Sequence, residues 1–168
     1  RLTALPILRQ ILPAKMKYLG KDAFRGCPYM TGTLRVPDGL DKFNNAWPDQ
    51  ISGPCLIPQG VKSINDIPVG ATYVSIPEGV EEIYGFGGSK IKGDLRLPAT
   101  VKTISRNAFS RCGMSHINIP EGIEIIEEWT FAYCENLQDT ITIPSTVKQI
   151  REDAFRNCSQ LTAVIFPA

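Results

Sequence analysis

The sequence has little net charge, a single histidine and no long apolar run. Across 168 residues, 18 Lys and Arg stand against 17 Asp and Glu, for a formal net charge of +1. This balance gives no basic surface for nucleic acid or for an anionic membrane. No apolar stretch approaches the roughly 18 residues that a membrane-spanning helix needs, and no secretory signal is visible at the start. We therefore expect no nucleic-acid partner and no membrane insertion of this segment.

Residue patterns of catalytic and metal centres are also missing. The five cysteines lack the two close pairs that zinc sites usually show. The segment GFGGSK, residues 85–90, fails the order of a phosphate-binding loop, in which Lys precedes Ser or Thr at the start of a helix. We interpret it as a glycine-rich detour. The sequence predicts no enzyme, no metal and no cofactor.

Proline supplies the clearest positive signal, because it recurs at spacings of 19 to 24 residues, each time after an apolar residue. Periods of this length are typical of leucine-rich-repeat solenoids. The stretches before these prolines, such as LRVP, INIP and ITIP, mostly alternate apolar and polar residues, as half-buried strands do. The repeat prolines are Pro13, Pro37, Pro58, Pro77, Pro98, Pro120, Pro144 and Pro167.

Three units, beginning at Pro98, Pro120 and Pro144, follow one consensus: Pro-x-(Gly/Thr)-(Val/Ile)-x-x-Ile-x-x-x-(Ala/Thr)-Phe-x-x-Cys, an apolar anchor and a strand. Each unit thus predicts two short extended pieces and one helical turn, and only stacked units bury their apolar faces. The fold class is a solenoid of about seven coils, rich in parallel strand. The array spans residues 1–168, is irregular over about 38–98 and is cut within a unit at both ends, as in part of a longer protein.

The repeated slots define a core. Phe24, Phe109, Phe131 and Phe155 should be buried, the last three as a stacked ladder.

Four cysteines recur 14 residues after a repeat proline, where a free thiol behaves as a small apolar group. We expect them to remain unlinked; Cys55 lies outside this slot. Cys112 should point inward and His116 outward, which argues against a Cys–His catalytic pair. The four cysteines are Cys27, Cys112, Cys134 and Cys158.

These units resemble the BspA-type, or Treponema pallidum type, leucine-rich repeats. The resemblance extends from about Leu12 to Pro167 and is specific from Pro98 onward, where Ala-Phe-x-x-Cys occurs twice and Thr-Phe-x-x-Cys once. It implies a curved solenoid with a parallel sheet on its concave side. It also implies a secreted or surface-attached protein with adhesive or recognition roles, and it supplies no catalytic residues.

The outward side of the pre-proline strands is the candidate binding surface. Counting back two and four residues from each proline gives side chains that alternate away from the core. The central ones carry hydrogen-bonding groups and one aromatic ring, which suit recognition of protein or glycan. We predict a monomeric adhesion module that binds an extracellular protein or glycan; a structural spacer with a merely solvated face is the alternative. The predicted contact residues are Tyr73, Ser75, Asp94, Arg96, His116 and Asn118.

Within this surface, an aromatic residue and an arginine one coil apart are the expected focus of binding. Tyr73 and Arg96 should lie about one strand spacing apart, near enough to act on one ligand. Asp94 is the alternative partner for Arg96, in an exposed pair that a ligand could displace.

Overall fold

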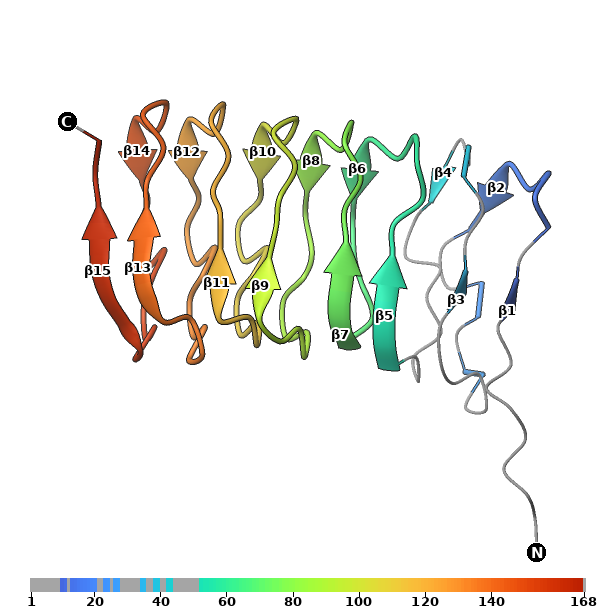
Figure 1. Ribbon diagram of the computed structural model, residues 1–168, viewed down its shortest axis with the longest axis horizontal. Helices are drawn as coiled ribbons and strands as arrows, with labels where there is room; N and C mark the ends of the chain where they lie inside the picture. The colour runs from blue at the N-terminus through green and yellow to red at the C-terminus, as the bar shows by residue number, and fades with distance from the viewer. Residues whose placement is uncertain are drawn as a thin grey trace, which may run out of the picture.

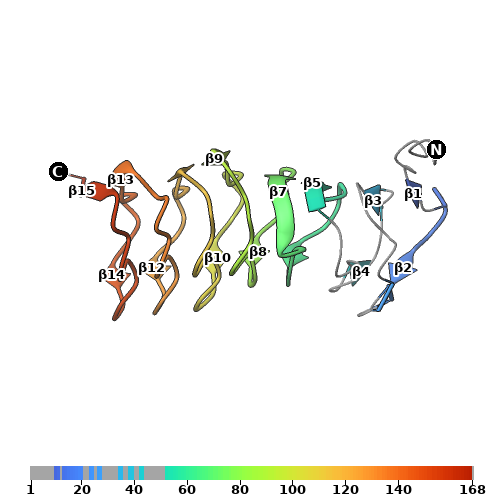
Figure 2. The same cartoon turned by 90° about the horizontal axis from the view of Figure 1, so that it is seen from below.

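The computed structural model describes residues 10–11, 13–20, 23–24, 26–27, 34–35, 38–39, 42–43 and 52–167. The described chain coils as a solenoid with two rows of short parallel strands, one on each side of the core (Figures 1 and 2). The pre-proline row consists of β1 (Gln10–Ile11), β3 (Leu34–Arg35), β5 (Ser52–Leu56), β7 (Gly70–Ser75), β9 (Asp94–Leu95), β11 (His116–Ile117), β13 (Asp139–Thr142) and β15 (Leu161–Ile165). The second row consists of β2 (Tyr18–Leu19), β4 (Lys42–Phe43), β6 (Ser63–Ile64), β8 (Glu82–Ile83), β10 (Thr103–Ile104), β12 (Ile125–Ile126) and β14 (Gln149–Ile150).

The predicted solenoid of parallel strands is confirmed, with two corrections of detail. The continuous part, residues 52–167, forms about five turns, fewer than the seven expected for the whole array. The described residues contain no helix, so the expected helical turns are wrong. Accordingly, this part of the chain offers no helix that could cross a membrane.

The segment expected to be helical is instead a run of tight turns linked to the next coil. Ala108 and Cys112 each donate a backbone hydrogen bond to the carbonyl three residues earlier. The third residue of each of these turns, Asn107 or Arg111, has a φ near +60°, as a type II turn requires. A residue in the left-handed conformation ends the α-helical path. As a result, the N–H group of every second residue points along the solenoid axis, toward the next coil.

These outward N–H groups are satisfied by the following coil. Asn107, Phe109 and Arg111 donate to the carbonyls of Glu128, Thr130 and Ala132, at 2.8 to 3.2 Å. The same pattern recurs one coil further on, where Trp129, Phe131 and Tyr133 donate to Glu152, Ala154 and Arg156. We call this repeated segment, 105–112 and its equivalents, the corner. Its inter-coil bonds offset the roughly 1–2 kcal/mol that a left-handed non-glycine residue costs.

Phenylalanine rings stack inside the corner as predicted. Phe109 and Phe131 are fully buried with ring centres 5.5 Å apart, and Phe155 continues the stack at 5.1 Å from Phe131. Phe24 and Phe155, which were also expected to be buried, are only half-buried, although both pack against the core.

The stack also includes a ring that the sequence did not predict. Phe86 lies 5.2 Å from Phe109, and its N–H donates to the Ala108 carbonyl. The segment around it therefore forms the second turn of a corner, with Gly85 and Ser89 in the places of Ala and Cys, and it lacks the first turn. The expected irregular detour is thus a shortened corner. Gly85 is required because a Cβ there would lie 2.5 Å from the Asn65 carbonyl oxygen.

The corner cysteines are free and directed inward, as expected. The thiols of Cys134 and Cys158 lie 3.0 and 3.1 Å from the carbonyl oxygens of Phe109 and Phe131, one coil earlier. Cys112 instead contacts the Ser89 hydroxyl at 3.1 Å. Cys55, which the repeat did not place, is the buried residue of β5 opposite Val74.

The ring stack predicts a large stability loss on truncation. Phe131→Ala should lower the free energy of unfolding by about 3–5 kcal/mol, because it removes the ring between Phe109 and Phe155 and leaves a cavity. Chemical denaturation followed by circular dichroism measures this change. Phe166→Ala is a suitable control, since that ring is 62% exposed; an equal loss in both variants would contradict the stacked core.

The thiols should be chemically quiet. Titration of denatured, unreduced protein should detect five free thiols, whereas detecting three would reveal a disulfide. In the native protein, Cys55, Cys112 and Cys134 should be alkylated far more slowly than Cys27, because burial both shields these thiols and raises their pKa. Unfolding curves measured with and without reductant should coincide.

Candidate functional site

The outward residues of the pre-proline row form one continuous surface, which we call the pre-proline face. Their exposure follows the predicted alternation within residues 52–167. The residues two before each proline are all exposed: Leu56, Ser75, Arg96, Asn118, Thr142 and Ile165. Those four before are exposed or, for His116, half-buried: Pro54, Tyr73, Asp94, His116, Thr140 and Ala163. The burial of Thr33 and Arg35 lies outside the description.

The surface changes character along the solenoid axis. On β5 and β7 it is apolar, because Pro54 lies opposite Tyr73 in the strand pairing and Leu56 follows. Tyr73 is 50% exposed and Leu56 39% exposed. From β9 to β13 the face is instead charged.

A histidine lies between two carboxylates on this charged part. The His116 Nδ1 is 3.0 Å from an Asp94 oxygen, and its Nε2 is 3.3 Å from an Asp139 oxygen. The three residues come from β9, β11 and β13, so the imidazole bridges three successive coils. A neutral imidazole has only one N–H, and only the imidazolium can donate to both carboxylates. The hydrogen bond to Asp139, with a further contribution from Asp94, therefore raises the pKa of His116.

Asp94 is thus engaged by His116, and the alternative pairing of Asp94 with Arg96 is not present. Asp139 was not among the predicted residues. It lies directly before the alternating part of its strand, at a register shift and with a φ of 59°. Strand alternation does not predict this left-handed conformation of Asp139, in which its carboxylate reaches the His116 imidazole.

Asn118 is exposed, but its amide is already used. Its Oδ1 accepts a hydrogen bond from the Leu97 N–H at 2.8 Å, and its Nδ2 donates to the Leu97 carbonyl at 2.9 Å. The side chain thereby takes the place of a neighbouring strand's backbone at the end of β9.

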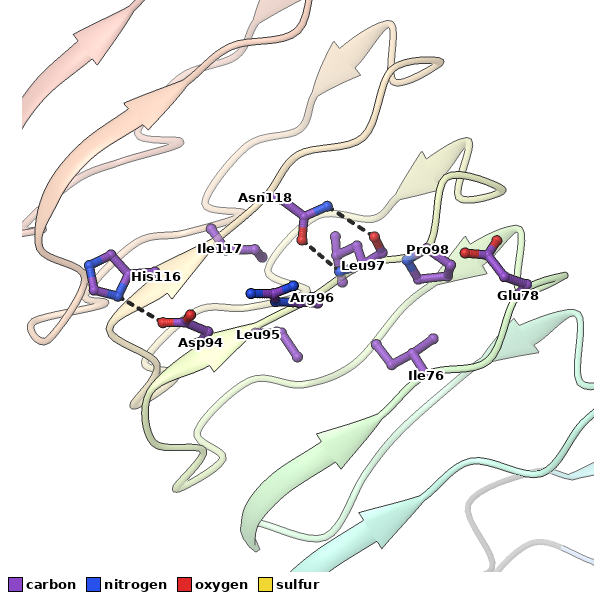
Figure 3. A pocket seen from close by; sticks show the side chains of 10 residues that line it. All are labelled: Ile76, Glu78, Asp94, Leu95, Arg96, Leu97, Pro98, His116, Ile117 and Asn118. Atoms are coloured by element: carbon purple, nitrogen blue, oxygen red, sulfur yellow. Dashed lines mark hydrogen bonds and ion pairs between the residues drawn. The ribbon is translucent and has the colours of Figure 1, made fainter.

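A hollow of about 580 Å³ opens on the pre-proline face, from the coil of β7 to β11 (Figure 3). Its polar rim includes Arg96 and Glu78, which lie well apart in the close-up. Within the described chain, neither side chain has a hydrogen bond or ion pair to another residue. The lining residues are Ile76, Glu78, Asp94, Leu95, Arg96, Leu97, Pro98, His116, Ile117 and Asn118.

The structure therefore brings four of the six predicted residues together. Asp94, Arg96, His116 and Asn118 line the hollow, whereas Tyr73 and Ser75 lie on the face beside it, on β7. Ile76 and Glu78 flank Pro77 and were not predicted, because strand alternation points outward only at the residues two and four before each proline. Their position around a repeat proline was the available signal.

The residues that line the hollow offer hydrogen-bonding and charged groups for a ligand, and Cys112 and His116 are not assembled as a pair. Cys112 is 1% exposed and contacts Ser89 inside the core, while His116 lies on the outer face, so the two do not form a pair. Among the described residues, no group of three or more His, Cys, Asp and Glu side chains is suited to hold a metal ion.

The carboxylate–imidazole–carboxylate contact predicts the titration of His116. Its pKa in the folded protein should exceed the ordinary value of about 6.5, and both Asp139→Asn and Asp94→Asn should lower it. NMR titration is direct because the chain has one histidine. Asp153→Asn, which removes a partner of Arg156 instead, should leave the His116 pKa unchanged.

The raised pKa of His116 also determines how this contact changes the stability of the protein with pH. Because the folded-state pKa is raised, the stabilisation is complete below the unfolded pKa and is lost as pH rises through the folded pKa. A His116 pKa at or below the ordinary value would contradict the bridge.

Comparisons with known proteins agree with this architecture. A crystal structure of a leucine-rich repeat protein from Bacteroides ovatus ATCC 8483 matches 97% of this chain with a TM-score of 0.77 and 22% sequence identity, a likeness of fold alone. This chain spans only 46% of that one. No curated protein matches the sequence significantly. Residues 69–168 match the model of the BspA type leucine rich repeat region in six copies. The chain therefore belongs to the family of BspA-type leucine-rich repeat proteins.

Proposed function

We propose that the pre-proline face binds an extracellular protein or glycan and that the protein is an adhesion module, secreted or attached at a cell surface. Leucine-rich-repeat solenoids commonly mediate protein interactions, and proteins with BspA-type repeats are often surface-associated or extracellular. The observation that carries the proposal is the hollow of about 580 Å³ with the unpaired Arg96 at its rim. Half of its lining residues are apolar and half are polar or charged, a mixture that suits contact with a protein or glycan surface.

The apolar patch beside the hollow supports the same surface. Tyr73 on β7 and Leu56 on β5 are exposed, and Arg96 on β9 has no partner among the described residues. Tyrosine and arginine are enriched among residues that dominate binding energy. Neither Tyr73 nor Arg96 belongs to the buried core, so their removal should leave the solenoid intact.

A structural spacer remains the second candidate, and one observation favours it. Asp94, His116 and Asn118, three of the six predicted contact residues, use polar side-chain atoms for bonds within the chain. Such bonds tie neighbouring coils together, as a spacer needs, and they leave fewer free groups for a ligand.

A double substitution separates the two candidates. Tyr73→Ala/Arg96→Ala should retain the parent's circular dichroism and lose most of its adhesion to immobilised extracellular-matrix proteins and glycans. Truncating hot-spot residues commonly costs about 2 kcal/mol or more each, so the bound fraction should drop severalfold at least. Thr140→Ala/Thr142→Ala, on the same face at β13, is the matched control and should bind like the parent. Equal binding by the parent and the Tyr73/Arg96 variant would favour the spacer.

A further inference from the structure

The pre-proline row is not a continuous sheet. Its strands hydrogen-bond in pairs, β5 with β7, β9 with β11 and β13 with β15, while β7 and β9 form no strand pair. Figure 1 shows the corresponding wider spacing between β7 and β9. We call the junction between these two strands the seam.

The seam is closed at its start and open at its end. The N–H groups of Lys90 and Lys92 donate to the carbonyls of Val69 and Thr72, at 2.9 and 3.0 Å. Beyond Lys92, no backbone hydrogen bond joins the two strands within residues 52–167. The hollow lies along this open end, where Ile76 borders it on one side and Asp94 to Leu97 on the other.

Polar backbone groups face into the open seam. The Ser75 carbonyl accepts a bond from the Ile57 N–H, so the Ser75 backbone points toward β5. Successive residues of a strand direct their backbone groups to opposite sides, so those of Val74 and Ile76 point toward β9. Backbone groups of this kind require partners, and within residues 52–167 the Ile76 N–H and C=O have no hydrogen bond to another residue.

One coil further on, the equivalent position shows which group fits. Leu97 and Ile76 each directly precede a repeat proline, and Asn118 and Arg96 are the outward residues of the strands that follow them. At Leu97, the Asn118 carboxamide bonds both the N–H and the C=O. At Ile76, Arg96 stands in the place of Asn118 and makes neither bond.

We propose that the seam binds an extended peptide segment of a partner protein. One amide group of the peptide bonds the Ile76 N–H and C=O, as Asn118 does at Leu97. A neighbouring Asp or Glu of the peptide pairs with the Arg96 guanidinium, whose planar fork matches a carboxylate. An apolar residue of the peptide contacts the patch of Leu56 and Tyr73. This inference rests on the proposed function and specifies its ligand as an extended peptide with a carboxylate that pairs with Arg96.

An array of random nine-residue peptides, acetylated and amidated so that no terminal charge remains, tests the carboxylate. Peptides retained by the parent should be enriched in Asp or Glu near an apolar residue. Arg96→Glu should weaken these peptides by about tenfold or more, since a paired charge is replaced by a repelling one, and should favour Lys or Arg instead. Lys92→Glu is the matched control, because this exposed lysine does not line the hollow; it should retain the parent's preference.

Hydrogen exchange tests the backbone contact independently. An enriched peptide should slow exchange of the Ile76 amide, while the Ile57 amide, already bonded within the sheet, should not change. Enriched peptides without a charge preference, indifference to Arg96→Glu, or unchanged Ile76 exchange would overturn the inference.

The outcomes also separate this inference from the proposed function. If no peptide binds but the parent still adheres through Tyr73 and Arg96, the ligand is a glycan or a folded surface, and the seam proposal alone fails. If neither peptides nor matrix components bind, both proposals fail.

Discussion

The solenoid depends on each coil returning to the register of the coil before it, because a single coil cannot bury its own apolar side chains. The corner enforces this register. Three backbone bonds pass from Asn107, Phe109 and Arg111 to the next coil, and the Phe109 and Phe131 rings stack with an angle of only 2° between their planes. A slip by one residue would break the backbone bonds and misalign the rings together. The rest of each coil needs only to span the distance between successive corners.

Because the corner sets the register between coils, the strand pairing and the side chains of the pre-proline face can differ from coil to coil. The strands there are short, and the row pairs them only two by two. Side chains compensate where backbone pairing stops: Asn118 bonds the Leu97 backbone, and His116 links Asp94 with Asp139. Where no side chain compensates, as at Ile76, the sheet stays open. The candidate site is thus a place where the repeat is incomplete, on a scaffold that the corner keeps regular.

The repeat period, the inward ring ladder and the outward alternation followed from the sequence because each is a local pattern imposed by the pleat or by stacking. Three features did not follow. The corner was expected to form a helical turn, whereas the left-handed conformation at Asn107 and Trp129 depends on bonds to another coil. Phe86 was overlooked because Gly and Ser replaced Ala and Cys. The contact of Asp139 with His116 depends on a strand irregularity that periodicity does not encode.

The uneven distribution of inter-coil bonds has a mechanical consequence. Between the coils of Phe109 and Phe131 the corner contributes three backbone bonds, while neither β11 and β13 nor β10 and β12 form a strand pair. Under tension along the axis, these two coils should separate first along the strand rows and stay joined at the corner. A pulling force applied through a partner bound on the pre-proline face would then act on a compliant part of the solenoid.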